Sequence, residues 1–274
     1  MPLTPLFDPL AAGRPMRVAA FLSGSGTNIR RLIEHRGKLA TGGRTAPFEI
    51  IFLFSDRSDG HCAGEKIALE NGLPYFSLDI RSFYERQSLK RSVGTAEGMA
   101  ARKKYDRVAK KLVDAFEIDV IALGGYMSYI TLQRCVNVHP ADLSLKLPNW
   151  ARRYVGDNAV RDAILAGETQ VRSSTLWTDD GVDSGPLLMV SEPLDVRLPV
   201  PVEDLVQDKE RFLQVVDDHQ DKLKEIGDWK IFPLTIEMIA EGRFSLDETG
   251  SVHVDGSPVP EGFRSSPRVQ TLNI

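Results

Sequence analysis

The sequence predicts an α/β protein with a doubly wound, mostly parallel sheet and a hairpin near its C-terminal end. Over the first half of the chain, short and continuously apolar runs alternate with segments that have helical apolar spacing. Such runs are typical of parallel strands buried on both faces, and their alternation with helices indicates strand–helix–strand units. Glycines or paired polar residues follow several runs, at the carboxyl ends where open α/β sheets place their sites.

Each element of the first half follows from its apolar pattern and its closing residue. Four apolar runs predict strands at residues 17–23, 48–54, 74–78 and 119–125. Helices are predicted from residue 27, over residues 63–71 and over residues 105–116. Gly72 closes the second of these helices, because glycine readily adopts the left-handed conformation that ends a helix.

The second half of the chain has a looser pattern. It predicts a helix at 156–166, strands at 172–178 and 187–191, charged helical sequence at 203–226, a helix at 232–240 and a hairpin over 244–254. Residues 1–15 contain four prolines and no clear period, so we expect an extended arm there. The predicted organisation is this arm (1–15), one domain over residues 16–263 and a C-terminal tail over residues 264–274.

Composition favours small-molecule ligands over polyanions. The 274 residues are 42% hydrophobic and 26% charged, with a net charge of -4 and a pI near 5.8. This balance gives no bulk attraction to nucleic acid or to a membrane surface. No apolar run of about 18 residues predicts a membrane span, and the first residues do not resemble a secretory signal. Two separated cysteines fit a reducing cytoplasm, and the five histidines lack metal-ligand spacing.

The first motif is Ser23-Gly24-Ser25-Gly26-Thr27-Asn28, between a predicted strand and a helix. Backbone N–H groups and the helix dipole favour an anion at such a position, and glycines permit a phosphate to approach the backbone. Ile29 replaces the third glycine of a dinucleotide fingerprint, and no Gly-Lys-Ser/Thr of a P-loop follows. Taken alone, the motif fits a tight structural turn equally well.

The second motif, Cys135 to Pro140, contains Asn137 and His139. Side chains alternate along a strand, so these two face the same side just at a strand's carboxyl end. The third motif runs from Asp179 to Pro186, and its Asp183 can accept a hydrogen bond from an imidazole or order a water. A structural histidine and a plain turn are the respective alternatives when each motif is taken alone.

Together, the order and spacing of the three motifs resemble those of the folate-dependent formyltransferases, and within them the glycinamide ribonucleotide transformylases. That family has Ser-Gly-x-Gly-Ser/Thr-Asn, then Asn-x-His-Pro, then Asp-x-Gly-x-Asp-Ser/Thr-Gly-Pro. Gly125-Tyr126-Met127 is similar to the family's Gly-Phe/Tyr-Met ahead of its folate pocket. Residues 241–248 and 255–256 resemble the terminal hairpin of the transformylases. The resemblance spans about residues 16–263.

The resemblance implies formyl transfer from 10-formyltetrahydrofolate to the amine of glycinamide ribonucleotide, in de novo purine biosynthesis, without a metal. It implies catalytic roles for Asn137, His139 and Asp183. It implies that the phosphorylated amine is bound by Gly24, Ser25, Gly26, Thr27, Asn28, Gly125 and Glu248. It implies that the folate is bound by Tyr126, Met127, Ser128, Tyr129, Ile130, Thr178 and Asp179. Asp183 is expected to orient His139 and favour its charged form, which with Asn137 stabilises an oxyanion. Glu248 is expected to contact the ribose, unless it pairs with Arg243 on the surface.

The chain also departs from the family pattern. Ala141 to Pro148 and a basic loop up to Gly156 replace the family's Ser-Leu-Leu-Pro and the glycine that soon follows it. Ser128 stands where arginine is common, and Asp228-Trp229 where Glu-His is usual. Residues 80–104 and 203–226 are extra, and the basic 80–104 segment is either a solvated helix or a lid that approaches an anion.

These departures leave the acceptor open. A related formyltransferase acting on another phosphorylated amine, or a formyltetrahydrofolate deformylase, remains an alternative. A non-catalytic nucleotide-binding module is a third, although the retained Asn137, His139 and Asp183 argue against it. The sequence predicts small-molecule partners, no nucleic acid or membrane partner, and a cytoplasmic location. It leaves a homodimer open.

Overall fold

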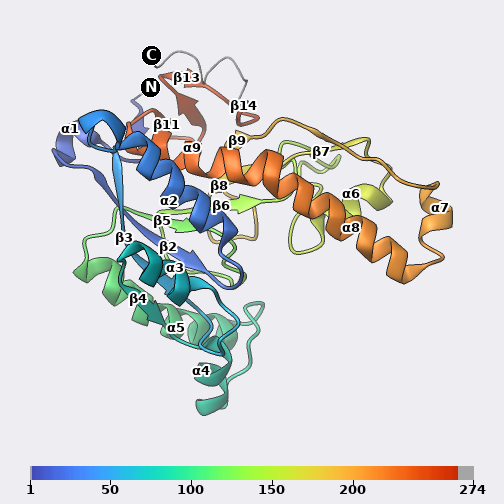
Figure 1. Ribbon diagram of the computed structural model, residues 1–274, viewed down its shortest axis with the longest axis horizontal. Coiled ribbons are helices and arrows are strands. Elements are labelled where there is room, and N and C mark those ends of the chain that lie inside the picture. Colours follow the sequence, from blue (N-terminus) through green and yellow to red (C-terminus); the bar gives the residue numbers. More distant parts are fainter. Residues whose placement is uncertain (1, 265–274) are drawn as a thin grey trace. The chain divides into compact units, whose positions relative to one another are not determined.

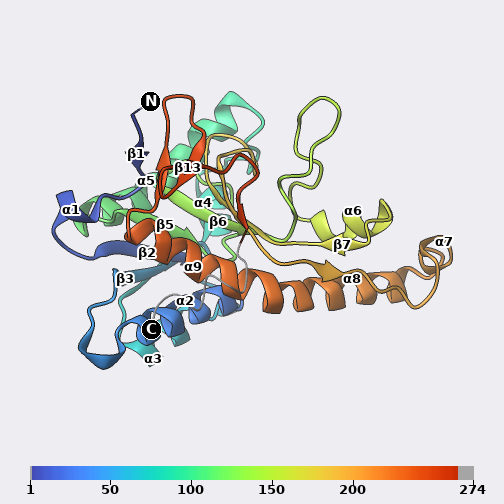
Figure 2. The same ribbon diagram turned by 90° about the horizontal axis from the view of Figure 1, so that it is seen from above.

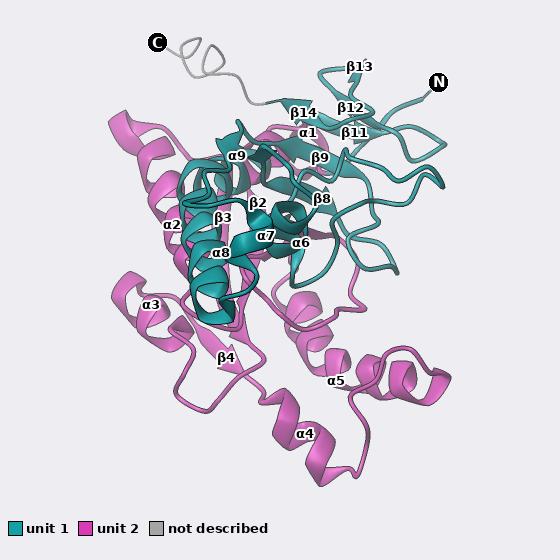
Figure 3. Cartoon of the chain, turned by 90° about the vertical axis from the view of Figure 1, so that its right-hand side faces the viewer, with its two compact units in different colours: residues 1–6, 138–235, 243–274 teal, residues 7–137, 236–242 magenta. Residues whose placement is uncertain are grey.

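The computed structural model describes residues 2–264, which divide into two compact units. Figure 3 colours them: unit 2 comprises residues 7–137 and 236–242, and the described part of unit 1 comprises residues 2–6, 138–235 and 243–264. Of the predicted tail, residues 264–274, only Arg264 lies within the described residues.

Unit 2 contains a parallel sheet in the order β6-β5-β2-β3-β4. Its strands are β2 (Met16–Leu22), β3 (Phe48–Ser55), β4 (Tyr75–Ser77), β5 (Val120–Leu123) and the first part of β6 (Cys135–His139). Chain order runs outward from β2 in both directions, so the loops after β2 and β5 meet at the point where the order reverses. Ligands of doubly wound sheets bind at that point.

Helices cover both faces of this sheet. Figure 3 shows α2 and α3 on one side of the strands and α5 on the other. The helical elements of unit 2 are α1 (Pro9–Ala12), α2 (Thr27–Leu39), the 3-10 turn Thr41–Gly43, α3 (Gly64–Asn71), α4 (Ile80–Arg86) and α5 (Ala96–Ala115). The predicted α/β fold with a mostly parallel sheet is confirmed.

Aromatic packing fills the core between the sheet and α5. Phe21, Phe52 and Phe54 are fully buried, and the ring centroids of Phe21 and Phe54 are 4.8 Å apart. They pack in one cluster with Ala109 and Val113 of α5. Burying rings of this size supplies much of a core's apolar contact area, which explains the continuous apolar runs of β2 and β3.

Helix α5 begins nine residues earlier than the sequence pattern predicts. Thr95 caps it by accepting a hydrogen bond from the Gly98 amide (3.1 Å). The basic 80–104 segment therefore forms α4 and the first turns of α5. Ile80, Tyr84, Ala101 and Tyr105 form a small buried cluster there, so the segment is more than a solvated excursion.

A buried ion pair lies on α5. Arg102 donates to Asp106 one turn later (Nη2–Oδ1 2.8 Å), and both side chains are 2% exposed. Arg102 also donates to the Tyr126 hydroxyl (3.2 Å), and Asp106 accepts from the Thr131 amide (2.8 Å). A buried pair of this kind is costly to break, because the remaining partner becomes an uncompensated buried charge.

Unit 1 is built from shorter strands. β8 (Ser174–Trp177) pairs antiparallel with β9 (Leu187–Val190), and β14 (Phe263–Arg264) lies parallel to β9. Two smaller antiparallel groups are β7 (Gln170–Val171) with β10 (Leu194–Asp195), and β1 (Thr4–Pro5), β11 (Phe244–Leu246), β12 (Val252–Val254) and β13 (Ser257–Pro258) in that order. The turn between β11 and β12 contains Glu248.

The helices of unit 1 enclose its own core. They are α6 (Ala159–Leu165), α7 (Val202–Leu205), α8 (Lys209–Leu223), the π-helical segment Lys224–Asp228 and the start of α9 (Trp229–Ala240). Figure 1 shows α8 leading through the π-helical segment into α9. Phe212, Val216 and Leu223 of α8 pack with α6, β8 and β9. The charged 203–226 sequence is thus an amphipathic core helix, and within residues 2–264 no helix is long and apolar enough to span a membrane.

The N-terminal residues adopt regular structure rather than an extended arm throughout. Thr4 and Pro5 pair with β11. The Asp8 carboxylate then accepts hydrogen bonds from the amides of Leu10 and Ala11 (3.0 and 3.1 Å), which starts the four-residue α1 at Pro9. Aspartate before proline is a favoured helix start, and so short a helix has no apolar periodicity.

We predict that Asp106→Ala lowers the free energy of unfolding by about 3–5 kcal/mol, because it leaves Arg102 buried and unpaired. The matched control is Asp114→Ala. Asp114 pairs with Lys110 at the same helical spacing on α5, but both side chains are more than half exposed, and such pairs contribute about 0.3–0.5 kcal/mol. Urea denaturation measures both; equal losses would refute the assigned role of burial.

Candidate active site

Strand β6 carries Asn137 and His139, two residues apart. Asn137 is the last residue of this strand within unit 2, and His139 is the second residue of unit 1 along β6. His139 is 5% exposed, whereas Asn137 is half-buried. The strand therefore presents one amide and one imidazole at its carboxyl end, as the alternation of the sequence predicts.

The structure brings Asp183 to His139. The His139 Nδ1 atom lies 3.4 Å from the Asp183 Oδ2 atom, and the two side chains are 7% and 9% exposed. The other ring nitrogen, Nε2, lies 3.2 Å from the backbone carbonyl oxygen of Tyr154. Both ring nitrogens of His139 therefore face acceptors.

Burial lowers the pKa of His139 below its ordinary value of 6.5. The Asp183 carboxylate and the Tyr154 carbonyl raise the pKa of the ring, but burial outweighs them, and the nearby Arg152 cation lowers it further. Asp183 thus favours the charged form of the ring, as expected, but burial has the larger effect in the free protein. The ring is neutral at neutral pH and carries a single hydrogen for its two acceptor neighbours.

Asp183 occupies a constrained loop between β8 and β9. Its φ of 50° lies in the left-handed region, which aspartate tolerates better than most residues. Asp179 holds the start of the loop by accepting from the Gly181 amide (3.0 Å) and the Ser184 hydroxyl (2.6 Å). At Gly185, a Cβ atom would lie 2.0 Å from the Trp177 carbonyl oxygen, so only glycine fits.

The basic loop before Gly156, which the sequence marks only as a departure from the family pattern, contacts this loop. The Arg152 guanidinium donates to the backbone carbonyl of Asp183 and to that of Gly185 (Nη2–O 2.6 Å). The Gly156 amide donates to Asp183 Oδ2 (2.9 Å). Figure 2 shows this segment between β6 and α6 as a long loop. No periodicity distinguishes Arg152 from Arg153, whose side chain pairs with Glu168 (2.9 Å).

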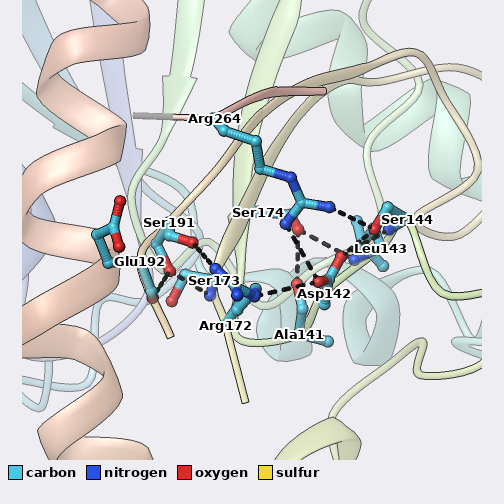
Figure 4. A network of polar contacts seen from close by, with 10 residues as sticks. All are labelled: Ala141, Asp142, Leu143, Ser144, Arg172, Ser173, Ser174, Ser191, Glu192 and Arg264. Carbon is cyan, nitrogen blue, oxygen red and sulfur yellow. Dashed lines mark hydrogen bonds and ion pairs between the residues drawn. The ribbon is translucent and has the colours of Figure 1, made fainter. Parts of the chain in front are cut away.

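A polar network fixes the turn that follows His139 (Figure 4). The Asp142 carboxylate lies 3.5 Å from Arg172 Nε and 3.4 Å from Arg264 Nη1. The Ser174 hydroxyl donates to the Ala141 carbonyl (2.6 Å) and accepts from the Leu143 amide (3.0 Å). The residues that replace the family's Ser-Leu-Leu-Pro are thus anchored to β8 and to β14.

The predicted phosphate loop lies wholly in unit 2, where it links β2 to α2. Gly26 has φ 66° and occupies the cap position of α2, where it supplies no side-chain acceptor of its own. The Ser23 amide donates to the Gly125 carbonyl (3.0 Å), and the Ser23 hydroxyl accepts from the Met127 amide (2.9 Å). These bonds bring the predicted substrate residues 24–28 beside Gly125.

The residues predicted to bind folate have different environments. Tyr126 and Ile130 are buried in the core of unit 2, Met127 is 66% exposed, and Ser128 and Tyr129 are half-buried. The Ser128 hydroxyl donates to the buried Asp56 carboxylate. Tyr126 can therefore offer a ligand only its backbone, since its ring packs on Phe21 and its hydroxyl contacts Arg102.

The remaining predicted residues lie in unit 1. Thr178 is half-buried and Asp179 is exposed at the start of the Asp183 loop. Glu248 is exposed in the β11–β12 turn, and Arg243, the surface partner considered for it, pairs with Asp255 (2.7 Å). Residues 2–264 contain no group of three or more His, Cys, Asp or Glu side chains arranged to hold a metal.

Comparison with known proteins identifies the family. The family model described as "Formyl transferase" matches residues 16–208. The chain belongs to the formyl transferase family. This confirms the family-level prediction, which rested on the motifs at residues 23–28, 135–140 and 179–186.

Several known formyltransferases are similar to this chain in sequence, and solved structures of such enzymes are similar to it in fold. The chain is 22% identical over 254 residues to the phosphoribosylglycinamide formyltransferase of Haemophilus influenzae, covering 89% of this chain and 96% of that protein. It is 23% identical over 252 residues to the Escherichia coli K12 enzyme of the same name, with the same coverages. A phosphoribosylglycinamide formyltransferase structure from Coxiella burnetii matches with a TM-score of 0.63 at 23% identity, covering 92% of this chain and 100% of that one.

The first motif of this formyl transferase contains two glycines that differ in the space available for a side chain. A Cβ atom on Gly26 would lie 2.5 Å from Ile67 Cδ1 and 2.8 Å from Leu22 Cδ1, whereas Gly24 has open space within 4 Å. We predict that Gly26→Ala destabilises the protein by at least about 1–2 kcal/mol, from strained φ and crowding. Gly24→Ala should change stability by less than about 0.5 kcal/mol. Thermal unfolding of both variants tests this, and an unaffected Gly26→Ala protein would contradict it.

Proposed function

We propose that this chain transfers a formyl group from 10-formyltetrahydrofolate to the primary amine of glycinamide ribonucleotide. The observation that carries the proposal is the buried His139–Asp183 pair (Nδ1–Oδ2 3.4 Å) beyond Asn137 on β6, in a member of the formyl transferase family. The relatives named phosphoribosylglycinamide formyltransferase support the acceptor. We also propose a cytoplasmic location, and the homodimer stays open.

In the proposed reaction, the amine nitrogen of the acceptor attacks the formyl carbon. A C–N bond forms, and the carbonyl oxygen becomes an oxyanion that accepts a hydrogen bond from the Asn137 amide. The bond from the formyl carbon to the folate nitrogen then breaks. The acceptor amine loses one proton and the leaving nitrogen gains one, so formylated ribonucleotide and tetrahydrofolate are the products.

Neutral His139 is suited to receive the proton from the attacking amine. The neutral ring can donate to only one of its two neighbours, the Tyr154 carbonyl or the Asp183 carboxylate. Once protonated, the ring can donate on both sides, and the Asp183 charge stabilises the buried imidazolium. In the proposed step, the amine delivers its proton to Nε2, the ring nitrogen beside the Tyr154 carbonyl.

The glycine-rich loop of unit 2 is the proposed anchor of the acceptor's phosphate. Gly24 and Ser25 are accessible there, and the N-terminus of the 13-residue α2 follows directly. Unpaired amide groups and the helix dipole favour a phosphate at such an end. Gly24→Ala, whose added Cβ atom has open space, is the variant that places a side chain where the phosphate would approach the backbone.

One observation supports a second acceptor. The loop 152–156, which departs from the family pattern, contributes the Tyr154 carbonyl that contacts His139 Nε2. A changed loop beside this nitrogen would suit an acceptor amine of different shape, carried by another phosphorylated compound.

The decisive experiment incubates the purified chain with 10-formyltetrahydrofolate and either glycinamide ribonucleotide, other phosphorylated amines or no acceptor, and identifies products by mass spectrometry.

Formylated glycinamide ribonucleotide as the main product is the expected result. Preferential formylation of another amine would replace the proposed acceptor. Release of formate without any acceptor would indicate a deformylase, and binding of either ligand without turnover would indicate a non-catalytic module.

Single removal of each catalytic side chain should slow turnover. Asn137→Ala, His139→Ala and Asp183→Ala should each reduce kcat by roughly 10²-fold or more, the scale of losing an oxyanion donor or an acid–base group. Asp180→Ala removes an exposed carboxylate from the same loop as Asp183 and serves as the control. Near-normal turnover of a folded His139→Ala protein would refute the mechanism.

Glu248 tests the identity of the acceptor. A carboxylate accepts hydrogen bonds from a ribose diol, and Glu248→Gln should weaken glycinamide ribonucleotide binding roughly tenfold while sparing folate. Isothermal titration with each ligand measures this, with Glu261→Gln as a control for loss of an exposed glutamate. An unchanged affinity would remove Glu248 from the proposed ribose site.

A further inference from the structure

Arg152 makes an unusual set of contacts for a residue on a basic loop. Its two terminal nitrogens each donate to a backbone carbonyl, one of Asp183 and one of Gly185, rather than to an exposed carboxylate. The planar guanidinium, with its fixed fork of donors, spans two acceptors in one orientation. Arg152 thereby fixes the loop backbone on both sides of Ser184.

This backbone does not hold its conformation by intrinsic preference. Asp183 has a φ of 50°, in the left-handed region that L-residues adopt rarely, although aspartate tolerates it better than most. The Asp179 carboxylate restrains residues 181 and 184, and the Gly156 amide contacts the Asp183 carboxylate itself. Of these contacts, only those of Arg152 hold the carbonyl groups of residues 183 and 185.

The direction of the Asp183 carboxylate depends on that conformation. Rotation of φ at residue 183 toward the ordinary negative range would swing the side chain and remove Oδ2 from its position 3.4 Å from His139 Nδ1. The segment 152–156, which carries Arg152, also provides the Tyr154 carbonyl that faces the other ring nitrogen of His139. Residues 152, 154 and 156 thus contact the His139–Asp183 pair at alternate positions along the segment.

We propose that Arg152 is a positioning residue, which holds the Asp183 backbone so that its carboxylate faces His139. The inference deepens the proposed function and rests on it for its activity measurement. Arg153 provides a matched contrast, since it is the adjacent arginine, is exposed and pairs with Glu168.

The first test compares Arg152→Ala with Arg153→Ala in the formyl transfer assay. Arg152→Ala should lower kcat roughly tenfold to a hundredfold, the scale of a misaligned catalytic group, with the folate KM changed less than about twofold. Added guanidinium ion should restore part of the loss, and Arg152→Lys should restore little, because one ammonium cannot span two carbonyls. Arg153→Ala should remain near wild type.

The second test needs no turnover. NMR titration of His139 should show that Asp183→Asn lowers the pKa of the ring, because the carboxylate raises it. In the Arg152→Ala background this effect of Asp183→Asn should shrink by at least half, since the carboxylate no longer faces the ring. In the Arg153→Ala background it should persist in full.

The outcomes separate the two proposals. If the wild-type chain does not formylate glycinamide ribonucleotide, the proposed function fails, and the NMR comparison still decides the role of Arg152. An equal effect of Asp183→Asn with and without Arg152 overturns the positioning role. A loss of kcat that guanidinium does not relieve in a protein with unchanged NMR coupling overturns it as well.

Discussion

The burial of His139 between two hydrogen-bond acceptors is the interaction on which the proposed site in unit 1 depends. Its ring lies between a carbonyl and a carboxylate, both hydrogen-bond acceptors, in a site with almost no solvent exposure. Burial disfavours the charged ring, whereas the acceptors favour it, and burial prevails in the free protein. The result is a group that is neutral at rest but has a partner ready on each side when it gains a proton, as an acid–base residue near neutral pH requires.

The surrounding contacts keep this arrangement in place. The Asp142 network ties the turn after His139 to β8 and to Arg264, while Arg152 and Gly156 fix the Asp183 loop. The altered stretch 141–156 is therefore part of the site's framework rather than a free surface insertion. Unit 2 has its own aromatic core, and in it the loops after β2 and β5 are joined through Ser23.

Much of the fold could be predicted because its signals are local. Continuous apolar runs define β2 and β3, Gly72 ends α3, and the strand-end positions of Asn137 and His139 follow from alternation. The family was likewise predictable from three short motifs. The role of Arg152 was not predictable. Its guanidinium binds two carbonyls that lie 31 and 33 residues later in the chain, and nothing in the local sequence distinguishes it from its exposed neighbour Arg153. The lowered pKa of His139 was not predictable, because it depends on burial, which sequence spacing does not report. The early start of α5 was missed because its first turns bury few large side chains.

The most direct test of the account is the pH dependence of kcat/KM for glycinamide ribonucleotide, expressed per neutral acceptor amine so that the acceptor's own titration is removed. This quantity reports the ionisation of the free enzyme. The pKa of His139 is lowered from 6.5, and the neutral ring is the proposed proton acceptor. The account therefore predicts a plateau at neutral pH and a fall in kcat/KM only below pH 6.5, as the ring becomes charged. A rate that rises as the pH falls through this range would show that the charged ring is the active form, and would contradict the account.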